Sequence, residues 1–510
     1  MVFRISLLLI AAFVIWGGIF PDGLADTASA LLTFTTGSFG WFYLFAALIF
    51  LLFVLYLGFG KYGRIRLGDD DEEPEYSNLS WFSMLFSAGM GIGLVFWGVA
   101  EPMSHYISPP PGAEAGTADA ARMAMRYSFF HWGLHPWAIY TVIGLSLAYT
   151  QFRKKRKGLI SQTFYPLIGE RVNGPIGKTI DVLAIIATAF GVATSLGLGT
   201  LQISGGLSYL TGISNQAGVQ IAIIGGLTIL FMLSASTGLD KGIKLLSNTN
   251  LIVAGTLLLF VLIAGPTFFL LDTFTTTTGG YLQNLIQMSL RLTPFSQGTW
   301  VAGWTLFYWA WWIAWAPFVG MFIARVSRGR TIREFVLGVL LLPSLFSFLW
   351  FSVFGGVGLH LELFEGKAIA EAVSNDVTTA LFLTLQELPV GTLLAWIATL
   401  LIVTFFITSA DSATFVLSML STGGDLNPSK RVRLTWGILQ SSIAVVLLLS
   451  HGLNALQTAS IVSALPFAII MLLMCLSLLR SLRQEEREFR KREKEWKRKV
   501  ELLVRQMEQQ

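Results

Sequence analysis

The sequence predicts an all-α protein that crosses a membrane many times. Its 510 residues are 54% hydrophobic and 13% charged, and that charged share is about half of the share in soluble proteins. The mean hydropathy is +0.65. Apolar runs also recur at roughly twenty residues, the length that a helix needs to cross the hydrocarbon core. Together these observations favour a polytopic helical membrane protein over a soluble one.

Twelve apolar segments are expected to span the membrane. The first, with Arg4 and a small-residue stretch at 28–30, loosely resembles a cleavable signal peptide. The many later spans favour an uncleaved first helix. The single cysteine, Cys475, excludes an internal disulfide. The expected spans are 3–20, 40–60, 79–103, 123–151, 178–206, 217–235, 249–272, 299–324, 334–358, 391–419, 432–450 and 455–479.

Basic residues gather in alternate loops. An excess of Lys and Arg marks the cytoplasmic loops of membrane proteins, so we expect both termini in the cytoplasm. The same loops account for the net charge of +5 without a nucleic-acid partner. The expected inside residues are Lys61, Arg64, Arg66, Arg153 to Lys157, Lys241, Lys244, Arg325, Arg328, Arg330, Arg333, Lys430, Arg431 and Arg433. The expected outside residues are Arg122, Arg126, Arg291 and Lys367.

Three segments lie outside the expected spans. Residues 281–292 are amphipathic and are expected at the outer surface, and residues 374–388 resemble them. The segment after Arg480 is highly charged, with basic residues in excess. It is either a solvated helix or a cytoplasmic helix that meets anionic lipid or a sister subunit. Its single apolar seam consists of Phe489, Trp496, Val500, Leu503 and Met507.

The third span contains Ser87-Ala-Gly-Met-Gly-Ile-Gly93, in which three glycines alternate with other residues. Each glycine weakens a helix by about 1 kcal/mol relative to alanine. Irregular backbone persists in a membrane only where it lines a cavity or is buried in protein, and broken helices mark transporter sites. We therefore expect a broken helix, with close helix packing through small residues as the alternative.

The eighth span is unusually rich in tryptophan. Residues 303–320 hold five of the 16 tryptophans and no charge. Indoles usually lie at the membrane interfaces, so indoles throughout a span require another reason. One is a quaternary ammonium group held by ring faces, and the alternative is tight packing of a buried helix. Trp304, Tyr308, Trp311 and Trp315 form one stripe, and Trp309 and Trp312 cover neighbouring faces.

Aromatic residues also line the fourth span. Three of them accompany a proline that is expected to kink the helix: Trp132, Trp137, Tyr140 and Pro136. These rings could form walls of a cage that Trp312 completes. His131 and His135 are four residues apart, which is compatible with a metal pair. Because no further ligand cluster accompanies them, we interpret them as hydrogen-bonded core histidines.

The tenth span crowds polar groups into one turn: Thr408, Ser409, Asp411 and Ser412. An intramembrane carboxylate is costly and suggests a functional site. Hydroxyl and carbonyl oxygens suit a hard cation such as Na⁺. The fifth span adds Thr188, Thr194 and Ser195. The alternative for each hydroxyl is a hydrogen bond to its own helix backbone.

Several of these residues belong to longer motifs. Two of these motifs are Trp-Thr-Leu-Phe-Tyr-Trp-Ala-Trp-Trp (304–312) and Ala-Arg-Val-Ser-Arg-Gly-Arg (324–330). The other motifs are Ala-Gly-Met-Gly-Ile-Gly (88–93) with Glu101-Pro102, His131-Trp132 with His135-Pro-Trp137, and Thr-Ser-Ala-Asp-Ser (408–412). Over all twelve expected spans, the chain resembles the betaine–choline–carnitine transporter family. Within that family it is similar to the sodium-coupled glycine betaine carriers of bacteria.

The resemblance implies an architecture that hydropathy alone does not reveal. Two leading helices would precede two five-helix repeats of inverted topology, a LeuT-like core, and the protein would form a homotrimer. The divisions would be 1–77 (leading helices and acidic loop), 78–272 (first repeat), 273–298 (outer-surface helix near the threefold contact), 299–480 (second repeat) and 481–510 (basic cytoplasmic helix).

The resemblance also implies site residues for the substrate. The trimethylammonium group would be enclosed by Trp132, Trp137, Tyr140 and Trp312. Trp311 and nearby backbone would face the substrate carboxylate. The inward path would be lined by Trp315 and Phe318.

Two sodium sites are implied in the same way. The ligands of the first would be the Ser87 and Met90 carbonyls with Phe405, Thr408 and Ser409. The second would involve Thr188 and the ring of Phe318. Val192 stands where a further threonine is expected in that site.

We therefore expect a Na⁺-coupled symporter of a bacterial plasma membrane that imports glycine betaine, or a related trimethylammonium osmolyte, for osmoprotection. Ring faces hold a permanent cation without a counter-charge, and the sequence suggests no acid near the cage, which favours a zwitterion over choline. Choline or carnitine transport, including Na⁺-independent exchange, is the alternative. Such exchange would need a fixed cation, and residues 248–251 offer none. No catalytic dyad is present, which disfavours an enzyme.

Overall fold

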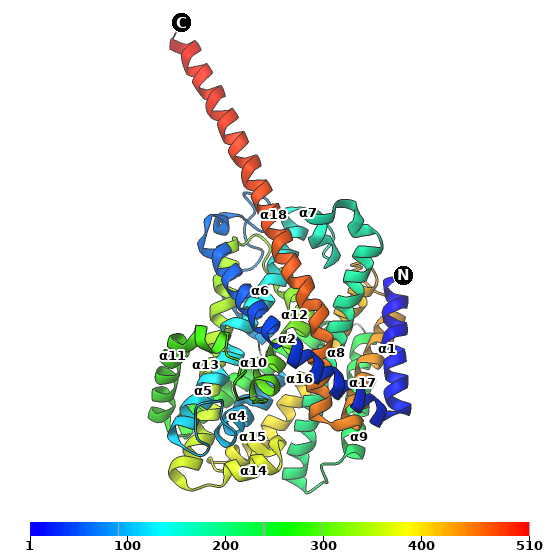
Figure 1. The fold of residues 1–510 in the computed structure, drawn as a ribbon, viewed down its shortest axis with the longest axis vertical. Coiled ribbons are helices and arrows are strands. Elements are labelled where there is room, and N and C mark those ends of the chain that lie inside the picture. Colours follow the sequence, from blue (N-terminus) through cyan, green and yellow to red (C-terminus); the bar gives the residue numbers. More distant parts are fainter. Residues whose placement is uncertain (90, 238–239, 297, 509–510) are drawn as a thin grey trace.

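Helices are the regular elements of this protein (Figure 1). The computed structural model describes residues 1–89, 91–237, 240–296 and 298–508. Within these ranges no β-strand forms, and one isolated bridge joins Arg66 to Thr331. The predicted all-α class is therefore confirmed.

Ten helical stretches in the described ranges are long and apolar enough to cross a bilayer. They are α1 (Val2–Ile19), α2 (Pro21–Phe59), α8 (Pro175–Thr211), α9 (Ala217–Thr237), α10 (Asp240–Ala264), η5 with α12 (Ala302–Leu306 and Phe307–Val326), α13 (Ile332–Glu365), α16 (Gly391–Ser421), α17 (Lys430–His451) and α18 (Leu453–Glu508). Short helices link them: η1 (Lys61–Arg64), η2 (Tyr149–Arg153), η3 (Ser161–Phe164), α7 (Tyr165–Ile168) and η4 (Gly169–Asn173).

The third and fourth expected spans are each divided into two shorter helices. The third consists of α3 (Asn78–Gly89) and α4 (Ile92–Ile107), so the predicted break at the glycines is confirmed. The fourth consists of α5 (Ala118–Trp132) and α6 (Leu134–Ala148). The count of twelve spans stays a prediction, as does the inverted repeat.

The break in the fourth span lies at Gly133 rather than at Pro136, where a kink was predicted. A Cβ on Gly133 would lie 2.6 Å from the Phe129 carbonyl oxygen and 2.9 Å from the Phe348 ring. Pro136 instead occupies the first turn of α6, where a helix has no backbone acceptor for an N–H group. Glycine therefore permits the break, and the proline fits within the helix that follows.

Several other boundaries differ from those expected. Residues 21–39 belong to α2, which begins with a proline at its first position. The surface helix expected at 281–292 is instead the second half of α11 (Thr267–Ser289). The reason is that α10 ends at Ala264, before the expected end of its span at 272, and a new helix starts after Pro266. The segment 374–388 contains η6 (Val377–Thr379) and α15 (Ala380–Gln386), and α14 (Ile369–Asn375) precedes it.

The core is centred on α12, which packs against α6, α8 and α18. The backbones of α12 and α6 come close because both helices carry glycine at the contact. A Cβ on Gly320 would lie 3.0 Å from the backbone nitrogen of Gly144. In Figure 1 the C-terminal part of α18 projects far beyond this helical body.

Loops that the charge pattern assigns to one membrane side lie together. Arg66 donates a 2.9 Å hydrogen bond to the carbonyl of Gly329 across 263 residues of sequence. Loops assigned to the opposite side also meet, where the Trp300 indole donates to the Ser108 carbonyl at 2.9 Å. The pairing of loops is therefore as the charge pattern predicts, while the side that faces the cytoplasm stays a prediction.

Candidate functional site

Four aromatic side chains that the sequence assigned to one cage lie together. The ring centroids of Trp132 and Trp312 are 4.8 Å apart at an interplanar angle of 77°. Tyr140 lies 6.1 Å from Trp312 at 80°, and Trp137 lies 5.4 Å from Tyr140. All four are buried. We call this group the aromatic cage, and helices α5, α6 and α12 supply it.

The helix break at Gly133 helps to position the cage. Trp132 is the last residue of α5, and the last carbonyls of a helix need partners outside it. One such carbonyl, that of His131, accepts a 2.9 Å hydrogen bond from the Trp312 indole. This bond fixes α12 against the end of α5.

Trp311 lies directly behind Trp312, with ring centroids 4.7 Å apart and planes 16° from parallel. Among the described residues, nothing accepts a hydrogen bond from its buried indole N–H. A Cβ on Gly93, in the first turn of α4, would lie 2.6 Å from Trp311 Cη2 and 3.1 Å from Trp132 Cη2. Glycine at this position therefore allows both indoles to approach the broken third span.

Trp315 and Phe318 continue along α12 beyond the cage. Their ring centroids are 5.2 Å apart, and both side chains are half-buried. The Trp315 indole donates a 2.7 Å hydrogen bond to the Gly191 carbonyl of α8. These two rings are therefore more accessible than the cage, which is compatible with the predicted path.

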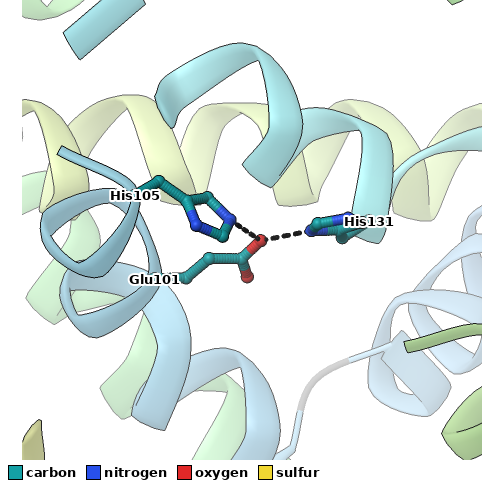
Figure 2. A group of neighbouring side chains, drawn as sticks. All are labelled: Glu101, His105 and His131. Carbon is teal, nitrogen blue, oxygen red and sulfur yellow. Dashed lines mark hydrogen bonds and ion pairs between the residues drawn. The ribbon is translucent and has the colours of Figure 1, made fainter. Parts of the chain in front are cut away.

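The expectation that no acid lies near the cage is wrong. Glu101 of α4 is fully buried, and its Oε2 accepts hydrogen bonds from Trp132 Nε1 at 2.8 Å and from the Tyr308 hydroxyl at 2.5 Å. Its other oxygen faces His105 and His131, as Figure 2 shows. A charged residue inside an apolar span was the signal that identifies such a group.

The two histidines of the fourth span are hydrogen-bonded core residues, as predicted. His131 contacts Glu101 Oε1 at 2.7 Å and Thr305 Oγ1 at 3.0 Å, and His135 contacts Ser289 Oγ at 2.9 Å. Ligand-type atoms of Glu101, His105 and His131 lie within 4.8 Å of one another. The expectation that no further ligand-type residues accompany these histidines is therefore wrong. The separations of 2.7 and 3.2 Å from Glu101 Oε1 to His131 Nδ1 and His105 Nε2 are hydrogen-bond lengths, while His105 Nδ1 has no partner among the described residues.

The hydroxyl groups assigned to the first sodium site lie on α16. Thr408 is buried and donates to backbone carbonyls of its own helix, including that of Phe405 at 3.2 Å. Ser409 is half-buried. The other predicted ligands are the carbonyls of Ser87 and Met90. Met90 lies outside the described residues, and for Ser87 the structure describes the backbone. The assembly of this site therefore stays a prediction.

The second sodium site also stays a prediction, and Thr188 is the one hydroxyl-bearing residue assigned to it. Thr188 is buried in α8 and donates to the Ala184 carbonyl at 2.7 Å, and Val192 follows one turn later. Thr188 and Phe318 lie one turn from the hydrogen bond that joins α8 to α12 at Trp315. Thr194 contacts Ser460 Oγ of α18 at 2.8 Å, so its hydroxyl serves helix packing.

Comparisons with known proteins show which proteins this chain is similar to. Residues 1–487 match the family described as BCCT, betaine/carnitine/choline family transporter. The glycine betaine transporter OpuD of Bacillus subtilis is 54% identical over 495 residues, which cover 97% of this chain and 96% of that protein. An ectoine/hydroxyectoine transporter of Virgibacillus pantothenticus is 51% identical over 487 residues, with 95% and 97% covered.

A probable glycine betaine transporter of Desulfitobacterium hafniense is 49% identical over 487 residues, again with 95% and 97% covered. These matches extend over nearly the whole chain, and the ten apolar helices agree with a multi-pass membrane protein. The chain therefore belongs to the betaine/carnitine/choline transporter family, and it is a transporter rather than an enzyme.

Proposed function

We propose that the protein imports glycine betaine together with Na⁺ by alternating access and thereby protects a bacterium against osmotic stress. The aromatic cage is the observation that carries this proposal. Trp132, Trp312 and Tyr140 present rings at nearly perpendicular angles, which suits a rounded trimethylammonium group. Each ring face contributes about 0.5–2 kcal/mol to binding of a cation.

The carboxylate of the proposed substrate also has a candidate hydrogen-bond donor in the protein. Glycine betaine carries a carboxylate close to its ammonium group. The Trp311 ring stacks on Trp312 of the cage, and its N–H has no acceptor among the described residues. An indole N–H can only donate a hydrogen bond, so the Trp311 N–H suits a carboxylate oxygen of the substrate. The names of two relatives at 49–54% identity, both of them glycine betaine transporters, support the same substrate.

Sodium coupling rests on the oxygen groups of α16. Thr408 and Ser409 supply hydroxyls next to the Phe405 carbonyl, and a hard cation prefers such ligands. Asn250 of α10 approaches Thr408, with 3.5 Å between Nδ2 and Oγ1. A neutral amide at this position does not replace a bound cation, which disfavours Na⁺-independent exchange of carnitine.

Choline is the second candidate substrate. The buried Glu101 carboxylate accepts a hydrogen bond from a cage indole, and a nearby negative charge favours a substrate with net positive charge. The four hydrogen bonds that Glu101 accepts disperse this charge. We therefore retain glycine betaine as the main substrate.

The proposal includes the assembly and the setting of the protein. We propose twelve spans with an inverted repeat, both termini in the cytoplasm and a homotrimer in the plasma membrane. The tail would meet anionic lipid or a sister subunit, because the seam residues Phe489, Trp496 and Met507 are exposed in the single chain.

Uptake into proteoliposomes tests the function directly. Labelled glycine betaine, choline and ectoine are offered with an inward Na⁺ gradient, with equal Na⁺ on both sides, and with K⁺ alone. Accumulation of betaine above the outside concentration only with the Na⁺ gradient is expected. Equal uptake without Na⁺ would contradict coupling, and preference for choline would identify the second candidate.

A further inference from the structure

Glu101 lies between α5 and α12, the helices that carry Trp132 and Trp312 of the aromatic cage. Its Oε1 accepts from His131 Nδ1 at 2.7 Å and from His105 Nε2 at 3.2 Å (Figure 2). Its Oε2 accepts from Trp132 Nε1 at 2.8 Å and from Tyr308 at 2.5 Å. Trp132 and Tyr308 donate to the carboxylate, and an ionised carboxylate can accept all four contacts when His131 Nδ1 and His105 Nε2 carry their protons.

The hydrogen-bonded group extends from Glu101 to two of the three cage indoles, Trp132 and Trp312. Trp132 is bonded to Glu101 directly. Trp312 is bonded to the backbone carbonyl of His131, the residue whose ring also contacts Glu101. The opposite nitrogen of that ring contacts Thr305 Oγ1 at 3.0 Å in η5, immediately before α12. One buried carboxylate thus connects α4, α5 and the start of α12.

We propose that Glu101 is a positioning residue for the cage, which it serves by holding the Trp132 and Tyr308 rings at a fixed orientation. This inference rests on the proposed function. Binding by a ring face depends on the angle that the face presents to the cation. A buried hydrogen bond to a charged acceptor is stronger than one between neutral groups, so the bond from its N–H restricts rotation of the Trp132 indole.

Two substitutions of Glu101 distinguish positioning from simple packing. Glu101→Ala removes both acceptor oxygens, and because a hydrogen bond to a charged group contributes about 1.5–3 kcal/mol, KM for betaine is expected to rise about tenfold or more. Glu101→Gln keeps one acceptor oxygen and the side-chain length, so its KM is expected to lie between those of the wild type and Glu101→Ala. The maximal uptake rate is expected to change much less than KM in both.

A double-mutant cycle with Tyr308→Phe identifies the route of the effect. This substitution removes the hydroxyl that donates to Glu101 and retains the ring. If the hydroxyl acts through Glu101, Tyr308→Phe raises KM in the wild type and has no further effect in Glu101→Ala. Residues that share a hydrogen-bonded group show such non-additivity, whereas independent sites are additive.

His135→Gln is the matched control. His135 is another buried histidine on the same span, but it contacts Ser289 and stacks on Trp309 at 5.1 Å. Its substitution is expected to lower thermal stability and to leave KM unchanged.

All variants are compared as full-length protein in proteoliposomes, after size-exclusion chromatography has verified folding. Unchanged KM in Glu101→Ala, or additive effects in the cycle, would overturn the positioning role. If Glu101→Ala does not fold, the cycle is made with Glu101→Leu, which also removes both acceptor oxygens but fills more of the space, and the same outcomes decide. Failure of the proposed function is distinct, because wild-type protein would then not accumulate betaine.

Discussion

Trp312 has two different contacts with the rest of the cage region. Its face adjoins Trp132 and Tyr140, while its N–H is bonded to the His131 carbonyl. Trp312→Leu removes the ring face, so we expect betaine binding to weaken by about 1–2 kcal/mol. Titration of intrinsic tryptophan fluorescence with betaine measures this change.

The control for this variant is Trp309→Leu. Trp309 lies on the same helix but stacks on His135 and contacts Phe130, so its loss should reduce stability without changing the dissociation constant. An unchanged dissociation constant in Trp312→Leu would exclude Trp312 from the binding site.

Substitutions of Thr408 and Ser409 test whether the first sodium site lies on α16. Thr408→Ala and Ser409→Ala each remove one oxygen ligand, and we expect a higher Na⁺ concentration for half-maximal uptake. Thr404→Ala is a matched control, because Thr404 lies one turn earlier and bonds the Leu400 carbonyl at 3.1 Å. Wild-type Na⁺ dependence in both site variants would show that these hydroxyls are not sodium ligands.

The cage could be predicted from the sequence because its residues belong to motifs of strong chemical character. Trp132 and Trp312 have large side chains of a type that is uncommon in the middle of membrane spans, and each lies in a recognisable motif of the sequence. Glu101 could not be assigned to the same place, because its partners lie 30, 31 and 207 residues away. Hydropathy periodicity reports which face of a helix is apolar, and it does not identify the distant donor that a buried carboxylate requires.

The junction between α18 and the tail is held by a group of charged residues around Glu485. Glu485 Oε1 contacts Arg153 at 2.7 Å, and its Oε2 contacts Lys154 at 2.7 Å and the Tyr149 hydroxyl at 2.6 Å. Arg153 also pairs with Asp70 at 2.6 Å. We call these residues the tail clamp, and it joins α18 to the loops that follow α2 and α6.

The tail clamp is expected to respond to pH only under acidic conditions. Burial acts to raise the pKa of Glu485, but hydrogen bonds from Lys154 and Tyr149 and the nearby cations outweigh it, so the pKa lies below the ordinary value of 4.5. A carboxyl group with a lowered folded-state pKa stabilises the fold above its ordinary pKa, and this stabilisation is lost as pH falls through the lowered value.

The variant Glu485→Gln tests this linkage. It should reduce the free energy of unfolding by about 1–3 kcal/mol, because charged hydrogen bonds are lost. Thermal unfolding in detergent should show a difference from wild type that is constant well above the ordinary pKa of 4.5 and that shrinks as the pH falls below it. Glu488→Gln, on the exposed side of the same helix, serves as control. A difference that grows as pH falls would contradict the assigned pKa direction.

Removal of residues 486–510 tests the tail itself. The clamp residue Glu485 is retained, while the exposed seam and most basic charge of the tail are lost. We expect betaine uptake to persist and its dependence on osmotic pressure to change, because basic residues near the inner leaflet each contribute about 1 kcal/mol to lipid attraction. Uptake across an osmolality series measures this, and identical activation curves would indicate a solvated helix without a regulatory role.

Element boundaries were predictable within two residues for α16, whereas α8 and α13 run five and seven residues past the expected ends at 206 and 358. They were not predictable where helices continue past the hydrocarbon, as at the start of α2 and along α18. The reason is physical, because hydropathy marks residence in lipid, whereas helix ends depend on caps, prolines and packing. Pro266, which divides α10 from α11, illustrates the second kind of signal.

The energetics of the complete transport cycle depend on the number of sodium ions. One Na⁺ moving through about 100 mV releases about 2.3 kcal/mol, and a tenfold gradient adds about 1.4 kcal/mol. One ion per betaine therefore supports accumulation on the order of 400-fold, and two ions support roughly the square of that. An importer that works against high internal betaine benefits from the second ion.

Val192 bears on this stoichiometry. It is buried one turn after Thr188 and offers no oxygen, so the second site must use other groups. Val192→Thr adds a hydroxyl at nearly the same volume, and we expect the Na⁺ Hill slope of betaine uptake to rise or to stay unchanged. A lower slope would place this position outside any sodium site, and Val182→Thr in the same helix is the control.

The length of α18 has a geometric consequence for the tail. The helix runs for 56 residues, and each residue advances it by about 1.5 Å and turns it by about 100°. The direction in which Phe489 and Trp496 face is therefore locked to the angular position of the membrane-embedded half of the helix. Deleting one residue between Arg480 and Phe489 would swing this seam through more than a quarter turn. Deleting seven residues of the same stretch, almost two full turns, would return the seam to nearly its original azimuth.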